Sequence, residues 1–308
     1  MVGIFLYASY FLCLIKCTPS PELSVKSFWH KAKWAIGVVS NPRGIGTEWQ
    51  IRNLPRFSRK DKGYIPSRSA FLVQRIAGFV CFYLFSWAYP QLLALLPLRV
   101  ENFESSKLRL FSLSTGELLV RVYYAVDAFQ LLYIGHNTLH WLVSAIAVLL
   151  GDSPERWPPL FGDIRDAYTL RRFWGKFWHG LVYKAFISNA AFISRKVLRI
   201  PERTKLDRWA ITFFAFCLSA FVHVVGDRVA GSPCSSAPIC VLYIRFGLAV
   251  VFEDAVQALY LRYFPQSDGK TKGNQGWKVV GYVWTLAFFS WSISNMFFAY
   301  VGCNSEDS

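Results

Sequence analysis

Two histidines lie in surroundings where an imidazole could move a proton. One of them, His223, stands in the apolar run Leu218-Ser-Ala-Phe-Val-His223, inside a helix predicted over residues 209–226. An ionisable side chain at hydrocarbon depth is costly, so it is a functional candidate by default. A neutral imidazole there can take a proton from a hydroxyl group and act as a general base. The alternative is a packing role, with the ring bonded to a neighbouring backbone carbonyl.

The second histidine, His179, ends a segment rich in cations and aromatic rings. The segment reads Leu170-Arg-Arg-Phe-Trp-Gly-Lys-Phe-Trp-His179. Tryptophan, arginine and lysine side chains are suited to the boundary between a membrane and water. An interfacial belt would explain Trp174, Lys176 and Trp178 without any chemistry, and this alternative stays open.

No metal site or covalent nucleophile is indicated by the other reactive side chains. His136 and His140 have a metal-ligand spacing on one helical face, but the chain has only five histidines, too few for a membrane di-iron centre. We therefore expect these two histidines to pack as polar side chains. The seven cysteines show no zinc spacing. No nucleophile elbow or phosphate loop is present either.

The composition is that of an integral membrane protein. Of the 308 residues, 54% are hydrophobic and 18% are aromatic, yet the formal net charge is +15. Several apolar runs approach the roughly 20 residues that cross a bilayer. In a membrane protein, lysine and arginine collect in cytoplasmic loops, so the excess of basic residues first indicates how the chain is oriented in the membrane. The same charge can also attract anionic lipid or a phosphorylated cofactor. Nucleic acid is not favoured as a partner.

We predict an all-α, polytopic membrane helix bundle with about six to eight membrane helices. Residues 180–193 are interrupted by Lys184 and Asn189, so we expect a re-entrant or interface-lying helix there. We interpret the short N-terminal run as an uncleaved membrane segment, with the end of a longer segment as the alternative. The predicted apolar segments are Val2–Ile15, Phe71–Leu98, Leu118–Leu150, Trp209–Gly226, Ile239–Tyr263 and Val279–Val301.

The loop charges agree with six crossings and lumenal termini. The basic loops 16–75, 151–208 and 262–278 alternate with the nearly neutral loops 99–117 and 227–238, as the positive-inside rule requires. We expect one integral-membrane domain over residues 1–308. Within it, 16–75 is expected to be a basic cytosolic loop and 160–226 the core segment that carries both histidines.

Three blocks of the chain resemble a known family. Asn41-Pro-Arg-Gly-Ile-Gly-Thr-Glu-Trp-Gln-Ile-Arg-Asn53 resembles the fungal R-G-I-G-T-x-W-Q signature. The segment 170–179 resembles the L-R-x-F-W-x-x-x-W-H block, and Ser219-Ala-Phe-Val-His223 resembles the S-A/G-x-x-H helix. These are blocks of the wax-synthase branch of the membrane-bound O-acyltransferases. The chain looks most similar to fungal members that acetylate hydroxyl groups of terpenoids and meroterpenoids.

The resemblance implies an enzyme that transfers an acetyl group from acetyl-CoA, used as a co-substrate, to a lipophilic alcohol. His223 would be the base, with His179 facing it across a buried acyl-transfer site. No permanently bound cofactor or metal is expected, and the implied location is the endoplasmic reticulum membrane. The polyanionic coenzyme A would meet a cationic mouth. Its expected binding residues are Arg171, Arg172, Trp174, Lys176 and Trp178.

Two departures from the wider family leave the roles of the histidines open. Related diacylglycerol acyltransferases carry asparagine where His179 stands, and an acid where this chain has Val224. Either histidine could therefore be the base. Two alternative functions also stay open. One is a long-chain wax-ester or sterol-ester synthase, and the other is a non-enzymatic transporter or scaffold.

Overall fold

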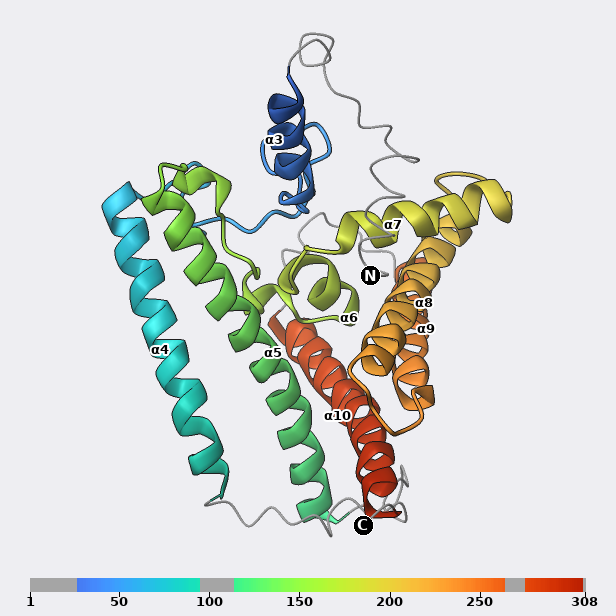
Figure 1. Ribbon diagram of the computed structural model, residues 1–308. Helices are drawn as coiled ribbons and strands as arrows, with labels where there is room; N and C mark the ends of the chain where they lie inside the picture. The colour runs from blue at the N-terminus through green and yellow to red at the C-terminus, as the bar shows by residue number, and fades with distance from the viewer. Residues whose placement is uncertain (1–26, 95–113, 264–274, 307–308) are drawn as a thin grey trace. The chain divides into compact units, whose positions relative to one another are not determined.

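The computed structural model describes residues 27–94, 114–263 and 275–306 (Figure 1). These residues form helices and loops and contain no strand, which confirms the all-α prediction. The predicted segment Val2–Ile15 lies outside the described residues. The helices are α3 (Phe28–Val39), α4 (Arg68–Ala94), α5 (Thr115–Leu149), α7 (Tyr183–Phe192), α8 (Lys205–Val229), α9 (Ala237–Tyr263) and α10 (Gln275–Glu306). The short helical turns are η4 (Pro154–Arg156), η5 (Ile164–Asp166), α6 (Leu170–Arg172), η6 (Phe173–Phe177) and η7 (Ile193–Val197).

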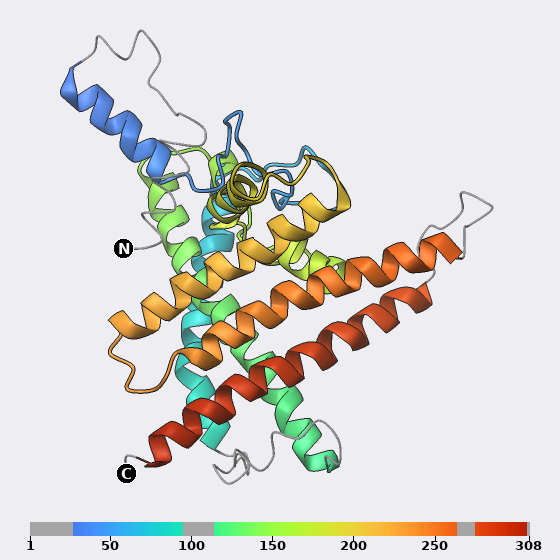
Figure 2. The same cartoon turned by 90° about the vertical axis from the view of Figure 1, so that its right-hand side faces the viewer.

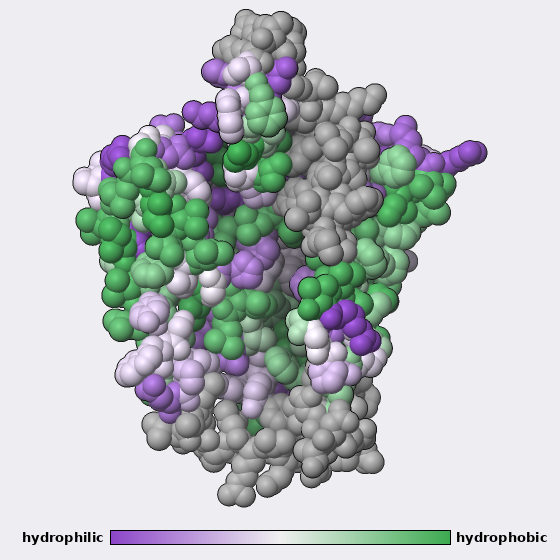
Figure 3. Space-filling model, viewed as in Figure 1, coloured by the Kyte–Doolittle hydropathy of each residue, from purple (hydrophilic) through white to green (hydrophobic). Residues whose placement is uncertain are grey.

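Among the described residues, three helices are long and apolar enough to cross a membrane, judged by length and composition. They are residues 68–92 of α4, the whole of α5 and the whole of α8. Apolar side chains such as Val73 and Trp87 stay exposed along α4, and Figure 3 shows hydrophobic residues over the upper part of this helix. Lipid, rather than water, suits such a surface. The α9 and α10 helices have the length but do not meet the same criterion, so the number of crossings stays a prediction.

The chain forms two compact units, each built from two separate stretches. Unit 1 comprises Met1–Leu54 and His179–Gly269, and unit 2 comprises Pro55–Trp178 and Lys270–Ser308. The boundary thus falls directly before His179 and separates it from the basic-aromatic segment that precedes it. The expectation of a single domain over residues 1–308 stays a prediction.

Unit 2 is built on α5, which packs against α4 on one side and α10 on the other (Figure 1). Against α4, the ring of Trp141 stacks on Phe82 with centroids 4.9 Å apart. Against α10, Phe129 meets Phe289 at 4.6 Å. The first turn of α5 is fixed by a capping box, in which the Ser114 and Glu117 side chains each accept a backbone N–H of the other residue. This cap starts the helix three residues before its predicted apolar beginning.

Unit 1 is built on α8, which runs antiparallel to α9 and is crossed by α7 (Figure 2). Gly247 lets α9 come close to α8, since an added Cβ there would lie 3.1 Å from Phe216. Where α7 crosses, Ala185 and Phe186 pack on a stripe of α8 formed by Ala215, Leu218 and Val222. With ten residues and a rise of about 1.5 Å per residue, α7 is too short for a full crossing, in agreement with the expectation for 180–193.

The turn between α7 and α8 is held by one buried carboxylate. Asp207 is fully buried in the first turn of α8. It accepts hydrogen bonds from the Ser194 hydroxyl (2.9 Å), the Arg195 guanidinium (3.0 Å) and the Arg203 backbone N–H (3.2 Å). The Thr204 side chain in turn caps the Asp207 backbone N–H. These bonds start α8 at Lys205, four residues before its predicted apolar beginning.

Candidate active site

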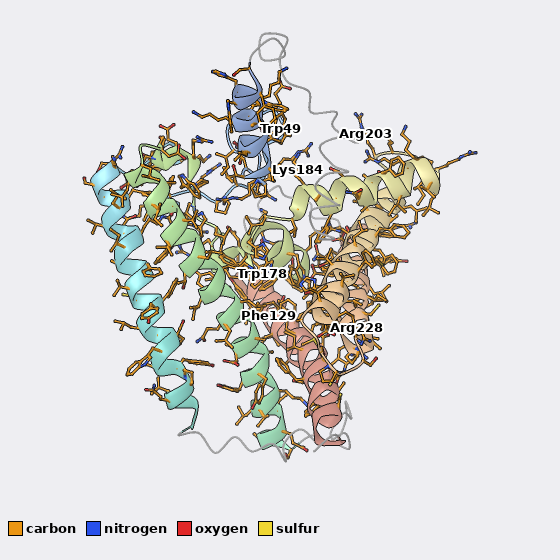
Figure 4. All side chains as sticks on the ribbon, in the orientation of Figure 1. Trp49, Phe129, Trp178, Lys184, Arg203 and Arg228 are labelled. Atoms are coloured by element: carbon orange, nitrogen blue, oxygen red, sulfur yellow. The ribbon has the colours of Figure 1, made fainter. Side chains whose placement is uncertain are left out.

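The basic-aromatic segment of unit 2 folds into a short α turn followed by a π turn, α6 and η6. Its rings pack inward instead of forming a belt. Phe173 stacks on Trp178 with centroids 5.5 Å apart, and both contact Phe129 of α5, at 4.9 and 5.2 Å. Figure 4 labels Phe129 and Trp178 in this cluster. Trp174 joins the same cluster, 6.1 Å from Phe129. The contacts of Trp174 and Trp178 are therefore mainly packing contacts within this aromatic cluster.

The three cations of the segment differ in how they are engaged. Arg172 donates to the Asp166 carboxylate and to its backbone carbonyl, both at 2.9 Å, and its guanidinium lies 4.2 Å above the ring of Tyr168. These contacts anchor the segment and occupy much of the guanidinium. Arg171 is half-buried, whereas Lys176 is exposed. Of the three predicted phosphate-binding cations, Lys176 is thus the most accessible.

His179 opens unit 1 in the short link that leads into α7, where it is half-buried. The next residue, Gly180, lies against the loop 41–53. A Cβ added to Gly180 would come within 2.6 Å of the Ile51 Cδ1, and Ile51 itself is buried. Burial, and then the nearby Arg52 guanidinium, lower the pKa of Lys184 in the first turn of α7. Loop 41–53 therefore packs against the short link, ahead of α7, that contains His179.

Loop 41–53 holds its own shape through a dense set of hydrogen bonds. The Asn41 side chain bonds both the N–H and the carbonyl of Ile45, at 2.8 and 2.9 Å. The Ile51 N–H closes the loop on the Arg43 carbonyl at 3.0 Å. Gly44 has a φ of +62°, and a Cβ added there would lie 2.7 Å from the Trp49 Cδ1, so a side chain at this position would be both strained and crowded. The Arg43 side chain of this loop is buried.

His223 lies on α8, at the edge of the face that packs on α9. Its Nδ1 is 2.8 Å from the Ser219 carbonyl oxygen, and its ring stacks on Tyr243 of α9 with centroids 4.3 Å apart. A carbonyl oxygen can only accept, so Nδ1 carries the proton and Nε2 keeps its lone pair. The residue as a whole is exposed. The carbonyl bond fits the packing alternative, and the same bond engages Nδ1 and leaves Nε2 as the basic nitrogen of the ring.

The two other helix histidines, His136 and His140, belong to unit 2. On α5 of unit 2, the His136 Nδ1 bonds the Leu132 carbonyl oxygen at 2.7 Å, and the ring of His140 lies 6.0 Å from Trp157. Across the described ranges, no group of three or more His, Cys, Asp or Glu side chains gathers as metal ligands would. Both histidines have the local surroundings expected of packing residues.

The comparison with family models gives one match. Residues 157–245 match the model described as "Membrane bound O-acyl transferase family". The matched region contains both candidate histidines and the basic-aromatic segment that precedes His179. Loop 41–53 lies outside it.

Fungal acetyltransferases are similar to the chain over most of its length. Acetyltransferase ataH of Aspergillus terreus is 31% identical over 83% of this chain and 85% of its own length. Acetyltransferase atnC of Arthrinium sp. is 31% identical over 86% of this chain, and acetyltransferase cdmC of Talaromyces verruculosus is 31% identical over 81%. The chain spans about three fifths of these last two, 61% and 62% of their lengths. No solved structure gives a significant match.

Proposed function

Because the chain belongs to the membrane-bound O-acyltransferase family, we propose that it transfers an acetyl group from acetyl-CoA to a hydroxyl group of a lipophilic metabolite. The family membership confirms the resemblance in the three sequence blocks. The choice of acetyl rests on the relatives, which are named acetyltransferases. A terpenoid or meroterpenoid acceptor and an endoplasmic reticulum location are proposed from the same resemblance.

The observation that carries the proposal is the hydrogen bond of His223. A general base needs an accessible lone pair on a ring held in one orientation. The bond from Nδ1 to the Ser219 carbonyl sets the tautomer, and the stack on Tyr243 sets the ring plane. In this tautomer Nε2 is the basic nitrogen, on a residue that is exposed. In this mechanism Nε2 takes the proton of the acceptor hydroxyl as the oxygen attacks the thioester carbonyl carbon.

The remaining steps are stabilisation of the oxyanion, cleavage of the C–S bond and return of the proton held by His223. The attack forms a C–O bond and a tetrahedral oxyanion, which preorganised donors stabilise. We assign this role to His179 or to backbone N–H groups near it. The C–S bond then breaks, and the coenzyme A thiolate leaves with the proton that the His223 imidazolium returns. Lys176, the exposed cation of the basic-aromatic segment, is our candidate partner for the coenzyme phosphates.

A series of acyl-CoAs of graded length tests the proposal against long-chain ester synthesis. We expect microsomes that carry the protein to acylate lipophilic alcohols fastest with acetyl-CoA, and more slowly as the chain lengthens. Product formation with each donor, at equal protein level, is the measurement. A maximum at long chains would contradict the acetyl assignment in favour of a wax- or sterol-ester synthase. Absence of transfer with every donor would favour the non-enzymatic alternative.

The contact behind His179 gives a second prediction. In Gly180→Ala the new Cβ must displace the Ile51 Cδ1, or the His179 link must move. We expect kcat to fall roughly tenfold or more, because small displacements of an acting group are costly. Ile51→Val removes only the crowded atom, at a cost of about 0.5–1.5 kcal/mol. The double variant should therefore recover most of the lost rate.

This rescue is what distinguishes positioning from a general loss of stability. Neighbouring changes that share one contact are non-additive, whereas independent ones add. Gly135→Ala on α5 is the matched control, since a Cβ there meets nothing within 4 Å. It should leave the rate unchanged. If the double variant were as slow as Gly180→Ala, or slower, the loop would not position His179.

A further inference from the structure

The turn that joins η7 to α8 exposes a group of cations. We call residues 195–208 the basic turn. Its two acids, Glu202 and Asp207, both pair with Arg195. Within the described part of the chain, the other cations of the turn form no ion pair and are exposed to the surroundings. They are Lys196, Arg199, Arg203, Lys205 and Arg208.

Two of these arginines sit in an unfavourable backbone conformation. Arg199 has a φ of 54° and Arg203 a φ of 63°, and no other non-glycine residue of the described ranges has a positive φ. Glycine or asparagine would adopt this conformation at lower cost. Strain of this kind persists only where the surrounding structure over-determines it, and it clusters at ligand-binding and other functional sites. The two arginines are therefore candidates for a binding role.

The basic turn also carries exposed apolar side chains. Val197 is 61% exposed, Leu198 51% and Leu206 57%. The turn leads directly into α8, a candidate span that begins at Lys205. In Figure 3 this end of the α7–α8 pair shows a hydrophilic tip above a hydrophobic surface, and Figure 4 labels Arg203 at that tip. Apolar side chains at the hydrocarbon edge, with cations at headgroup depth, fit a lipid surface.

The turn is rigid enough to hold these cations in one arrangement. Buried Asp207 binds the hydroxyl of Ser194, the guanidinium of Arg195 and the backbone of Arg203. Neither acid is left to neutralise the exposed cations. We propose that the basic turn binds the headgroup phosphate of an anionic phospholipid, with Arg199 and Arg203 as its main ligands. This site does not depend on the acyl-transfer proposal.

The test uses the full chain in nanodiscs of phosphatidylcholine with a few per cent dansyl-labelled phosphatidylserine. Energy transfer from the protein tryptophans to the dansyl group reports binding, and unlabelled phosphatidylserine or phosphatidylcholine is the competitor. We expect Arg199→Gly with Arg203→Gly to lower the apparent affinity for phosphatidylserine roughly tenfold or more. The same change relieves the backbone, so the melting temperature should stay equal or rise. A structural role would move stability the other way.

Two further variants complete the test. Arg56→Gln with Lys62→Gln removes two exposed cations of unit 2 and should leave the affinity unchanged. Lys196→Gln with Lys205→Gln removes charge from the basic turn without touching the strained positions, and should give an intermediate loss. Unchanged competition by phosphatidylserine in the Arg199 and Arg203 variant would overturn the proposal. So would an equal loss in the unit 2 control, or a raised KM for acetyl-CoA with unchanged lipid binding.

Discussion

Replacing His223 with alanine is expected to lower the rate of acetyl transfer by about 10²–10⁴-fold, the usual contribution of a positioned proton acceptor. The variant keeps α8 but has no Nε2 to take the proton of the acceptor hydroxyl. The side chain is exposed and packs mainly on Tyr243, so membrane insertion should be normal. Transfer from labelled acetyl-CoA to a panel of lipophilic alcohols, in microsomes with matched protein levels, measures the effect.

Two companion variants separate the base from a packing histidine. His223→Gln can keep a donor toward the Ser219 carbonyl but has no basic nitrogen, so it should be as slow as the alanine variant. His136→Ala is the matched control, because its Nδ1 makes the same bond to the carbonyl four residues earlier on α5. It should leave the rate unchanged. A His223→Ala protein with the wild-type rate would refute the base assignment.

The long helices could be predicted from sequence because their signal is local. Hydrophobic runs predicted 118–150 and 239–263, and the structure has α5 over 115–149 and α9 over 237–263. The helices α5 and α8 start earlier than their hydrophobic runs because of N-terminal caps. The Ser114–Glu117 box begins α5, and the bonds around Asp207 begin α8, on polar residues that a hydropathy pattern does not detect.

The contacts between distant segments could not be predicted in the same way. Nothing in the periodicity of residues 41–53 says that Ile51 will lie against Gly180, since that contact depends on how unit 1 folds. The glycine next to His179 was the available signal, and it indicated close approach without naming the partner. Likewise, nothing in the sequence predicts that Arg172, which stays a proposed coenzyme A ligand, bonds to the Asp166 carboxylate. The role of each site residue remains a proposal for mutation to test.

His179 is expected to matter almost as much as His223, with His179→Ala lowering kcat by about 10²–10³-fold if its ring N–H stabilises the oxyanion. The KM for acetyl-CoA should change little, because the lost interaction belongs to the transition state. The variant should insert normally into the membrane. Loss of the protein itself would instead indicate a structural role for the half-buried ring.

The variant His179→Asn distinguishes an oxyanion-stabilising role of His179 from a general-base role, because asparagine and histidine differ in whether they can accept a proton. An asparagine amide donates a hydrogen bond but cannot accept a proton at neutral pH. If His179 stabilises the oxyanion, the asparagine variant should recover a large share of the rate that alanine loses, as the asparagine at this place in related acyltransferases suggests. If His179 is the base, asparagine and alanine should be equally slow, and His223→Gln should then retain activity. The two possible role assignments therefore predict opposite results. Measuring His179→Ala, His179→Asn, His223→Ala and His223→Gln in one assay assigns the role of each histidine.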